Sequence, residues 1–184
     1  MDGIEQRLRH QCMDWLAQRE YSRHELAQKL TRRFFGPNSR RATPTAAASA
    51  VSLLADDASD VRVTPDANQL IEATLVWLEE RQFLSDERCA RLYVRSHIER
   101  GHGSLRIRQE LVFQKRLAAE LVDAQLNACG CDWFALAASV LAKRFRRPAA
   151  DLKEKARQLR FLQLRGFTAD QCYYALEHLQ LADD

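Results

Sequence analysis

The residues of this chain best suited to binding another molecule are arginines and histidines gathered around two glycines. In RSHIERGHGSLRIRQEL, residues 95–111, Gly101 and Gly103 stand on either side of His102, with arginines before and after them. Glycines let a backbone approach a phosphate closely, and a helix beginning at Ser104 would offer free N–H groups to an anion. The same residues fit a plain turn, in which Gly101 ends one helix and Ser104 caps the next. The pattern favours the turn and leaves a minor contact with a phosphate backbone open.

Patterns that would support catalysis or metal binding are weak elsewhere. The chain contains no G-x-x-x-x-G-K-[ST] phosphate loop, no H-E-x-x-H helix and no G-x-S-x-G elbow. Cys129 and Cys131 would need a second pair of ligands to form a typical zinc site, and none is present at a suitable spacing. The acid pairs at 56–57 and 183–184 fall in a predicted loop and in the tail. We therefore expect no enzyme activity, no cofactor and no metal site.

Three groups of basic residues at helical spacing are the strongest candidates for a binding surface. Residues three or four apart share a helix face, so the first and third groups would each form a stripe beside apolar residues that face the core. In the second group the basic residues point away from the core, which Ile107 and Leu111 face. Such stripes suit DNA phosphates and an acidic protein groove equally well. They can also be plain solvated faces, and Arg106 with Glu110 can be an ordinary i,i+4 ion pair. The candidates are Arg88, Arg91 and Arg95; Arg106, Arg108 and Lys115; Lys153, Arg157 and Arg160; and, close to these groups, Arg100 and Arg165.

Helices are expected to position these residues, because apolar side chains recur at helical spacing and no segment shows the sustained alternation of a strand. The spacings Ser22–Glu25 and Thr168–Gln171 match capping boxes, and Gly166 suits the left-handed residue at a helix end. The expected helices cover residues 5–20, 22–30, 68–81, 86–99, 104–115, 118–128, 132–146, 151–165 and 168–180.

These helices fall into three groups of three, which indicates an internal repeat of roughly 45–50 residues. We predict an all-α fold of three tandem three-helix modules, at residues 1–84, 85–130 and 131–184, that form an elongated, curved helical array. Residues 36–67 are rich in Pro, Ser, Thr and Ala and break the pattern. We interpret them as a flexible insertion in the first module, with room for a short helix at 46–55, and a functional arm is the alternative.

Composition indicates a protein of the cell interior. The chain has 184 residues with 28 Lys and Arg against 25 Asp and Glu, so its net charge of +3 does not by itself indicate a nucleic-acid binder. Its five cysteines form no C-x-x-C pair and are expected to be reduced thiols. We find no signal peptide and no apolar run near the ~18 residues of a membrane span. We expect a cytoplasmic monomer without a membrane partner.

Three blocks of sequence stand in one order along almost the whole chain outside residues 36–67. They are LAQREYSRHELAQKL, FLSDERCARLYVRSHIERGHGSLRIRQEL and KARQLRFLQLRGFTADQ. Together they resemble the RecX family of bacterial regulators of the RecA recombinase. The resemblance implies an all-α protein of three modules that binds in the groove of RecA filaments on DNA. It also implies restraint of ATP hydrolysis, strand exchange and co-protease activity, which would modulate recombinational repair and the SOS response, together with direct DNA binding in many members.

The chain departs from the family pattern at three positions near the two glycines. Cys89 and His102 stand where aromatic residues are usual, and His97 stands where an arginine is usual. Two functional hypotheses remain, a regulator that binds the RecA filament and a basic DNA-binding module for which contact with RecA is secondary. The sequence does not separate them, because a nucleoprotein filament presents acidic protein beside anionic DNA.

Overall fold

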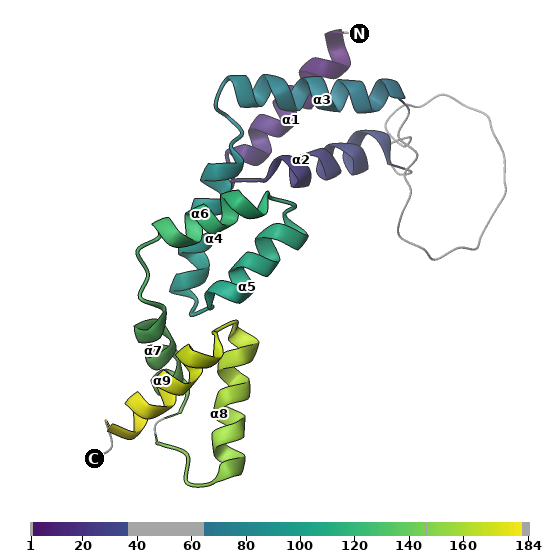
Figure 1. Ribbon diagram of the computed structural model, residues 1–184. Helices are drawn as coiled ribbons and strands as arrows, with labels where there is room; N and C mark the ends of the chain where they lie inside the picture. Colours follow the sequence, from purple (N-terminus) through teal and green to yellow (C-terminus); the bar gives the residue numbers. More distant parts are fainter. Residues whose placement is uncertain (1, 37–64, 146, 182–184) are drawn as a thin grey trace, which may run out of the picture. The chain divides into compact units, whose positions relative to one another are not determined.

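The computed structural model describes residues 2–36, 65–145 and 147–181, and divides into two compact units, Met1–Ser85 and Asp86–Asp184 (Figure 1). The described residues are helical and contain no strand, so the all-α prediction is confirmed. The predicted module boundaries and the shape of the array stay predictions. Of the predicted insertion, residues 37–64 and the short helix at 46–55 lie outside the described residues.

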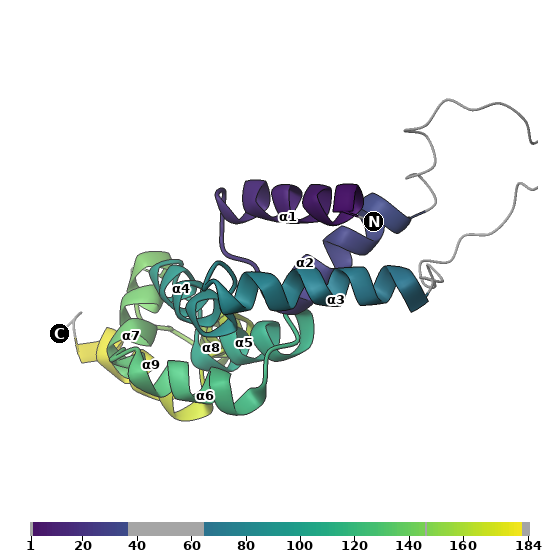
Figure 2. The ribbon, with the colours of Figure 1, turned by 90° about the horizontal axis from the view of Figure 1, so that it is seen from above.

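The first unit is a three-helix module. It consists of α1 (Asp2–Leu16), α2 (Arg23–Leu30), which continues into the π-helical turn η1 (Thr31–Phe35), and α3 (Pro65–Glu80). Figure 2 shows α3 running alongside α1, and α3 packs against both α1 and α2. Helix α3 begins at Pro65, three residues before the predicted start at 68. Proline is well tolerated at the first position of a helix, because the N–H that it lacks would have no partner there.

Local signals place the start of α2 as the sequence predicts. The hydroxyl of Ser22 accepts a hydrogen bond from the N–H of Glu25 at 3.2 Å, and the carboxylate of Glu25 accepts one from the N–H of Ser22 at 3.3 Å. The capping box is therefore confirmed. The core below it consists mainly of leucines: Leu8, Leu26, Leu30, Leu75, Leu78 and Leu84, with Cys12, Tyr21 and Ile71.

The second unit begins with a module formed by α4 (Asp86–Glu99), α5 (Ser104–Gln109), the π-helical turn η3 (Glu110–Gln114) and α6 (Ala119–Ala128). Helices α4 and α5 both pack against α6. Their apolar faces form a separate core of Ala90, Val94, Ile107, Leu111, Leu117, Val122 and Leu126.

The second helix ends in a π-helical turn in both of these modules, which the sequence did not predict. In η3 the N–H of Lys115 donates to the carbonyl oxygen of Glu110 at 3.2 Å, a bond between residues five apart. A single α-helix was expected over residues 104–115. A period of 3.6 residues cannot reveal one widened turn, because the apolar residues on either side still reach the same core.

The third module consists of α7 (Trp133–Arg144), α8 (Leu152–Arg165) and α9 (Ala169–Leu181). Asp132 caps α7 and Asp151 caps α8, each through a side-chain oxygen that accepts backbone N–H groups. The predicted box at Thr168 and Gln171 is confirmed by reciprocal bonds of 3.0 and 3.4 Å. Helix α7 packs closely along α9 over a core of Ala137, Val140, Leu141, Leu162, Phe167, Cys172, Ala175, Leu176 and Leu179.

The turn between α4 and α5 agrees only partly with the sequence prediction. Gly101 ends α4 in the left-handed region, with φ of +73°, and its N–H donates to the carbonyl oxygen of Ile98 at 2.8 Å. The prediction that Ser104 is the N-cap of α5 is wrong, because Ser104 is the first residue of that helix. Gly103 holds the cap position, and no side chain caps the helix.

The first N–H groups of α5 bind instead to the carbonyl end of α8 in the third module. The N–H of Gly103 donates to the carbonyl oxygen of Arg165 at 2.8 Å, and the N–H of Leu105 donates to that of Gly166 at 3.1 Å. The negative end of one helix thus meets the positive end of another, and each satisfies groups that a helix end leaves without an internal partner. These two N–H groups are therefore not available to a phosphate.

This contact brings two backbone segments together so closely that neither Gly103 nor Gly166 has room for a side chain. A Cβ atom on Gly103 would lie 2.2 Å from the carbonyl oxygen of Gly166, and a Cβ atom on Gly166 would lie 2.3 Å from the Cβ atom of Arg106 and 2.5 Å from its backbone nitrogen. Gly166 also has the predicted left-handed conformation, with φ of +88°. The guanidinium of Arg165 adds a further bond across the joint, to the carbonyl oxygen of Arg100 at 2.9 Å.

Replacing Gly103 with alanine should destabilise the second unit by about 1–3 kcal/mol, the usual cost of forcing an extra methyl group into a packed site. Since φ of Gly103 is −81°, which alanine adopts freely, the loss would come from the contact alone. Urea-induced unfolding followed by circular dichroism measures it.

Two glycines provide matched controls for this variant. Gly3 has no atom within 4 Å of an added Cβ and lies in α1, so Gly3→Ala should cause no loss. Gly130 also has open space but φ of +63°, so Gly130→Ala isolates the cost of a left-handed alanine, about 1 kcal/mol. A Gly103→Ala protein as stable as the wild type would show that the backbone contact does not hold the two modules together.

Candidate functional site

The first predicted basic stripe lies on the outward face of α4. Arg91 and Arg95 are exposed, whereas Ala90 and Val94 on the opposite face are buried. Arg88, at the start of the stripe, is partly buried. Arg95 donates to the carboxylate of its neighbour Glu99 at 3.3 Å, an exposed i,i+4 pair of the kind that contributes little to stability.

The second predicted stripe is largely engaged in contacts within the molecule. Arg106 binds Glu110 at 2.8 Å, which confirms the i,i+4 alternative. Arg108 donates two hydrogen bonds to the carboxylate of Asp123 on α6, at 2.6 and 3.0 Å. Hydrogen bonding within this pair raises the pKa of Arg108 and lowers the pKa of Asp123. The ammonium group of Lys115 lies 5.4 Å from the ring centre of Tyr93.

The third predicted stripe, on α8, differs from the second. Lys153, Arg157 and Arg160 are all exposed, and within the part of the chain that the structure describes none of them forms an ion pair. The guanidinium of Arg157 lies 5.9 Å from the ring centre of Phe145. Two exposed leucines, Leu152 and Leu164, lie on the same helix. This stripe therefore offers positive charge and apolar surface together.

The two remaining candidates lie at the joint between α4 and α8. Arg165 donates to the backbone of Arg100, and its guanidinium lies 5.2 Å from the ring centre of Phe161. The side chain of Arg100 is exposed. Arg165 thus has a structural contact, which leaves Arg100 as the outward-facing member of the two.

A polar network in the second module was not anticipated from the sequence. The hydroxyl of Tyr93 donates to Oε2 of Glu110 at 2.8 Å, and Nδ1 of His97 lies 3.0 Å from the carbonyl oxygen of Tyr93. Nε2 of His97 lies 3.5 Å from the same Oε2. The ring of His102 lies 5.1 Å from that of His97, centre to centre. The spacing of Tyr93 and His97, one helical turn apart, was the available signal.

Burial sets the protonation state of this network. Burial lowers the pKa of His97 below its ordinary value and outweighs the attraction of Glu110, so at neutral pH the two do not form an ion pair. Burial also lowers the pKa of His102, with nearby Arg106 adding to the effect. The pKa of Glu110 is lowered despite its burial, because Tyr93 and Arg106 donate hydrogen bonds to its carboxylate.

Three of the five cysteines are thiols rather than reactive thiolates. Burial raises the pKa of Cys12 to about 12 and that of Cys131 to about 11, and it also raises the pKa of Cys172. These groups are therefore thiols at neutral pH, and the thiolate is the form that attacks substrates or binds metals.

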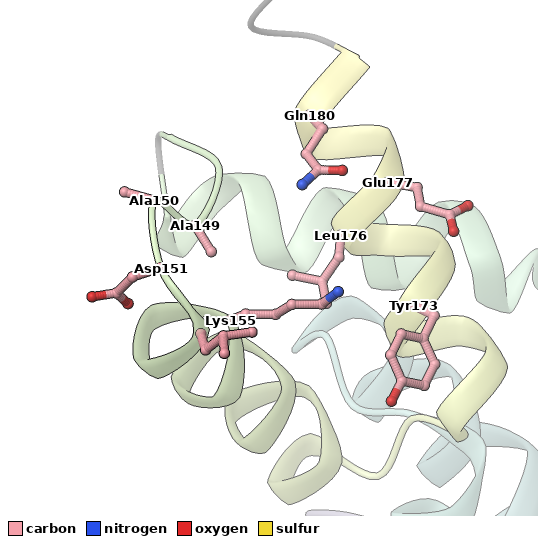
Figure 3. A pocket seen from close by; sticks show the side chains of 9 residues that line it. Ala149, Ala150, Asp151, Lys155, Tyr173, Leu176, Glu177 and Gln180 are labelled. Carbon is pink, nitrogen blue, oxygen red and sulfur yellow. The ribbon is translucent and has the colours of Figure 1, made fainter.

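A pocket in the third module lies between the loop before α8, the first turns of α8, and α9 (Figure 3). Lys155 extends across it towards α9, whereas Asp151 and Glu177 point to opposite sides. Asp151 is already engaged as the cap of α8. The two carboxylates therefore do not form a paired acid and base of the kind found in carboxylate-based catalytic sites. None of the helices in the described residues is long and apolar enough to cross a membrane.

Comparison with known proteins assigns the second and third modules separately. Residues 85–126 match the model of the second three-helix domain of RecX, and residues 131–176 match that of its third three-helix domain. The two matches fall on α4–α6 and on α7–α9.

Individual relatives extend the similarity to the first module. The chain is 36% identical to the regulatory protein RecX of Halorhodospira halophila over 165 residues, which cover 89% of this chain and 83% of that protein. It is 36% identical to the same protein of Serratia proteamaculans over 157 residues, 85% and 88% of the two chains. Over 107 residues, 58% of this chain and 68% of the other, it is 45% identical to that of Vibrio campbellii. The chain belongs to the RecX family of regulatory proteins.

Proposed function

We propose that this protein binds the RecA filament on DNA, in the filament groove, and restrains ATP hydrolysis, strand exchange and co-protease activity. It acts as a cytoplasmic monomer without catalytic activity of its own, and modulates recombinational repair and the SOS response. Membership of the RecX family supports a regulatory role on RecA. We assign binding to the filament to the basic residues.

The observation that carries the proposal is the exposed basic stripe on α8. An arginine that already binds an internal carboxylate, as Arg108 binds Asp123, gains less free energy from binding a new anionic partner. Lys153 and Arg160 form no ion pair within the described residues. Of the side chains of α8, only Gln158 and Leu162 are buried. We therefore rank the α8 stripe and Arg91 above Arg106 and Arg108 as contacts with the filament.

A second candidate function is binding to DNA alone. The same exposed side chains suit phosphates, which attract Lys and Arg whatever the base sequence. On this alternative the protein would compete with RecA for DNA rather than act on the filament. The two functions predict different stoichiometries, since a competitor must cover the DNA whereas a filament regulator need not.

DNA binding should be weak, independent of base sequence and steeply dependent on salt. If four phosphates are neutralised on single-stranded DNA, the affinity should fall about 50-fold between ~50 and ~200 mM salt. Lys153→Gln with Arg160→Gln should reduce the log–log salt slope by about 1.4, twice the value for one phosphate. Fluorescence anisotropy with a labelled oligonucleotide measures both. A wild-type affinity that is flat over this range would exclude phosphate contacts by the basic stripes.

RecA inhibition should depend on the α8 stripe. Lys153→Glu with Arg160→Glu reverses two exposed charges without breaking any ion pair formed among the described residues, so the fold should be retained. We expect the concentration that halves RecA ATPase on single-stranded DNA to rise at least 10-fold. Wild-type inhibition should be complete well below one molecule per RecA.

The matched control changes the net charge by the same amount elsewhere. Arg7 and Arg32 are exposed residues of the first unit, so Arg7→Glu with Arg32→Glu should inhibit RecA nearly as well as the wild type. Equal losses in both variants would point to total charge rather than to the α8 stripe. Loss of DNA binding with intact inhibition would remove the basic stripes from the regulatory surface, and the acidic segment 66–87 would then be the next candidate.

A further inference from the structure

Three possible metal ligands converge in the second module, on the side where it meets the third. One ligand atom from each of His97, His102 and Glu110 can be chosen so that all three lie within 4.8 Å of one another. They come from three separate segments, α4, the turn after it, and η3. The N–H of His102 donates to the carbonyl oxygen of His97 at 3.0 Å, which holds the turn beside α4.

The hydrogen bonds of His97 leave a lone pair aimed at a carboxylate. The carbonyl oxygen of Tyr93 can only accept a hydrogen bond, so Nδ1 of His97 carries the proton in the contact of 3.0 Å. In the neutral ring Nε2 is then a bare acceptor, and it faces Oε2 of Glu110 at 3.5 Å. Two electron-rich atoms at this distance repel each other unless a positive group lies close to both.

His102 supplies an independent indication of a ligand. Its Nδ1 atom is buried and has no hydrogen-bond partner among the described residues. A buried polar atom without a partner costs free energy, and native structures seldom leave one in place without a reason. His102 is one of the three residues whose ligand atoms converge with the lone pair of His97.

The surrounding groups have the form of an outer shell around a metal. Metal-binding histidines usually donate their other ring N–H to a carbonyl or carboxylate, as His97 does to Tyr93. The carboxylate of Glu110 is fixed on both sides, with Oε1 bound to Arg106 and Oε2 to Tyr93. Arg106 lowers the affinity for a cation, but it binds the carboxylate oxygen that does not face His97.

We propose that His97, His102 and Glu110 bind one divalent transition-metal ion, with zinc the best match. Two imidazoles and one carboxylate are borderline ligands that suit zinc better than magnesium or calcium. Tetrahedral zinc at ~2.0–2.1 Å from each ligand needs ligand atoms about 3.4 Å apart, close to the present distance between His97 and Glu110. Only His102, half-buried in a turn, has to move, by up to about 1.4 Å from the present limit of 4.8 Å. A fourth position is left for water.

The test is titration of the chelator-treated full chain with zinc alone, by calorimetry. We expect one saturable site in the wild type and at least a 10-fold weaker one in His102→Gln. His178 is an exposed histidine of the same unit, and His178→Gln should bind zinc within about threefold of the wild type. Thermal unfolding gives a second readout: zinc should raise the midpoint of the wild type and of His178→Gln but not that of His102→Gln.

Two further arms separate this site from adventitious binding by thiols. Cys129→Ser with Cys131→Ser should leave the zinc affinity unchanged, and cobalt should produce visible absorption without a thiolate charge-transfer band. Absence of saturable binding in the wild type would overturn the proposal. So would a His102→Gln protein that binds as tightly as the wild type, or loss of the site in the double cysteine variant. None of these outcomes depends on RecA, so the metal site and the proposed function can fail separately.

Discussion

The second unit depends on one backbone contact, in which Gly103 at the start of α5 presses against Gly166 at the end of α8. Two hydrogen bonds cross it, and a Cβ atom on either glycine would collide with the other segment. The contact joins helix ends of opposite partial charge, so it satisfies polar groups that would otherwise need side-chain caps. A purely apolar interface would leave these N–H and carbonyl groups without partners.

Internal contacts account for part of the positive charge around the glycines. A helix C-terminus carries partial negative charge, which basic side chains stabilise. Arg165 lies at such an end and binds the carbonyl oxygen of Arg100 across the joint, while Arg106 binds Glu110. Arginines that appear as one basic segment in the sequence therefore divide into structural groups and exposed groups. Their concentration at one place in the sequence says little about how many face a partner.

Sequence reasoning succeeded at three places where the structure is decided by residues close together in the sequence. The boxes at Ser22 and Thr168 and the left-handed Gly166 were predicted correctly, because each depends on neighbours along the chain. The cap of α5 was predicted wrongly, because Ser104 gives way to carbonyl groups more than 60 residues away in the sequence. The partner of Arg108 was missed for the same reason, since Asp123 belongs to another helix. The π-helical turn was missed because periodicity does not detect one extra residue in a turn.

The candidate surface follows from this division of the charges rather than from their number. Asp123 binds Arg108 through two hydrogen bonds. This carboxylate has to be displaced before Arg108 can bind a partner in the same geometry. Helix α8 is held to the molecule at its C-terminal end by Gly166 and by a few buried side chains, which leaves its cationic face in solvent. The same glycine contact fixes where that face lies relative to α4 within the second unit. A partner that binds both helices would therefore meet their basic residues at a set separation, and simultaneous binding to both would be stronger than binding to either alone.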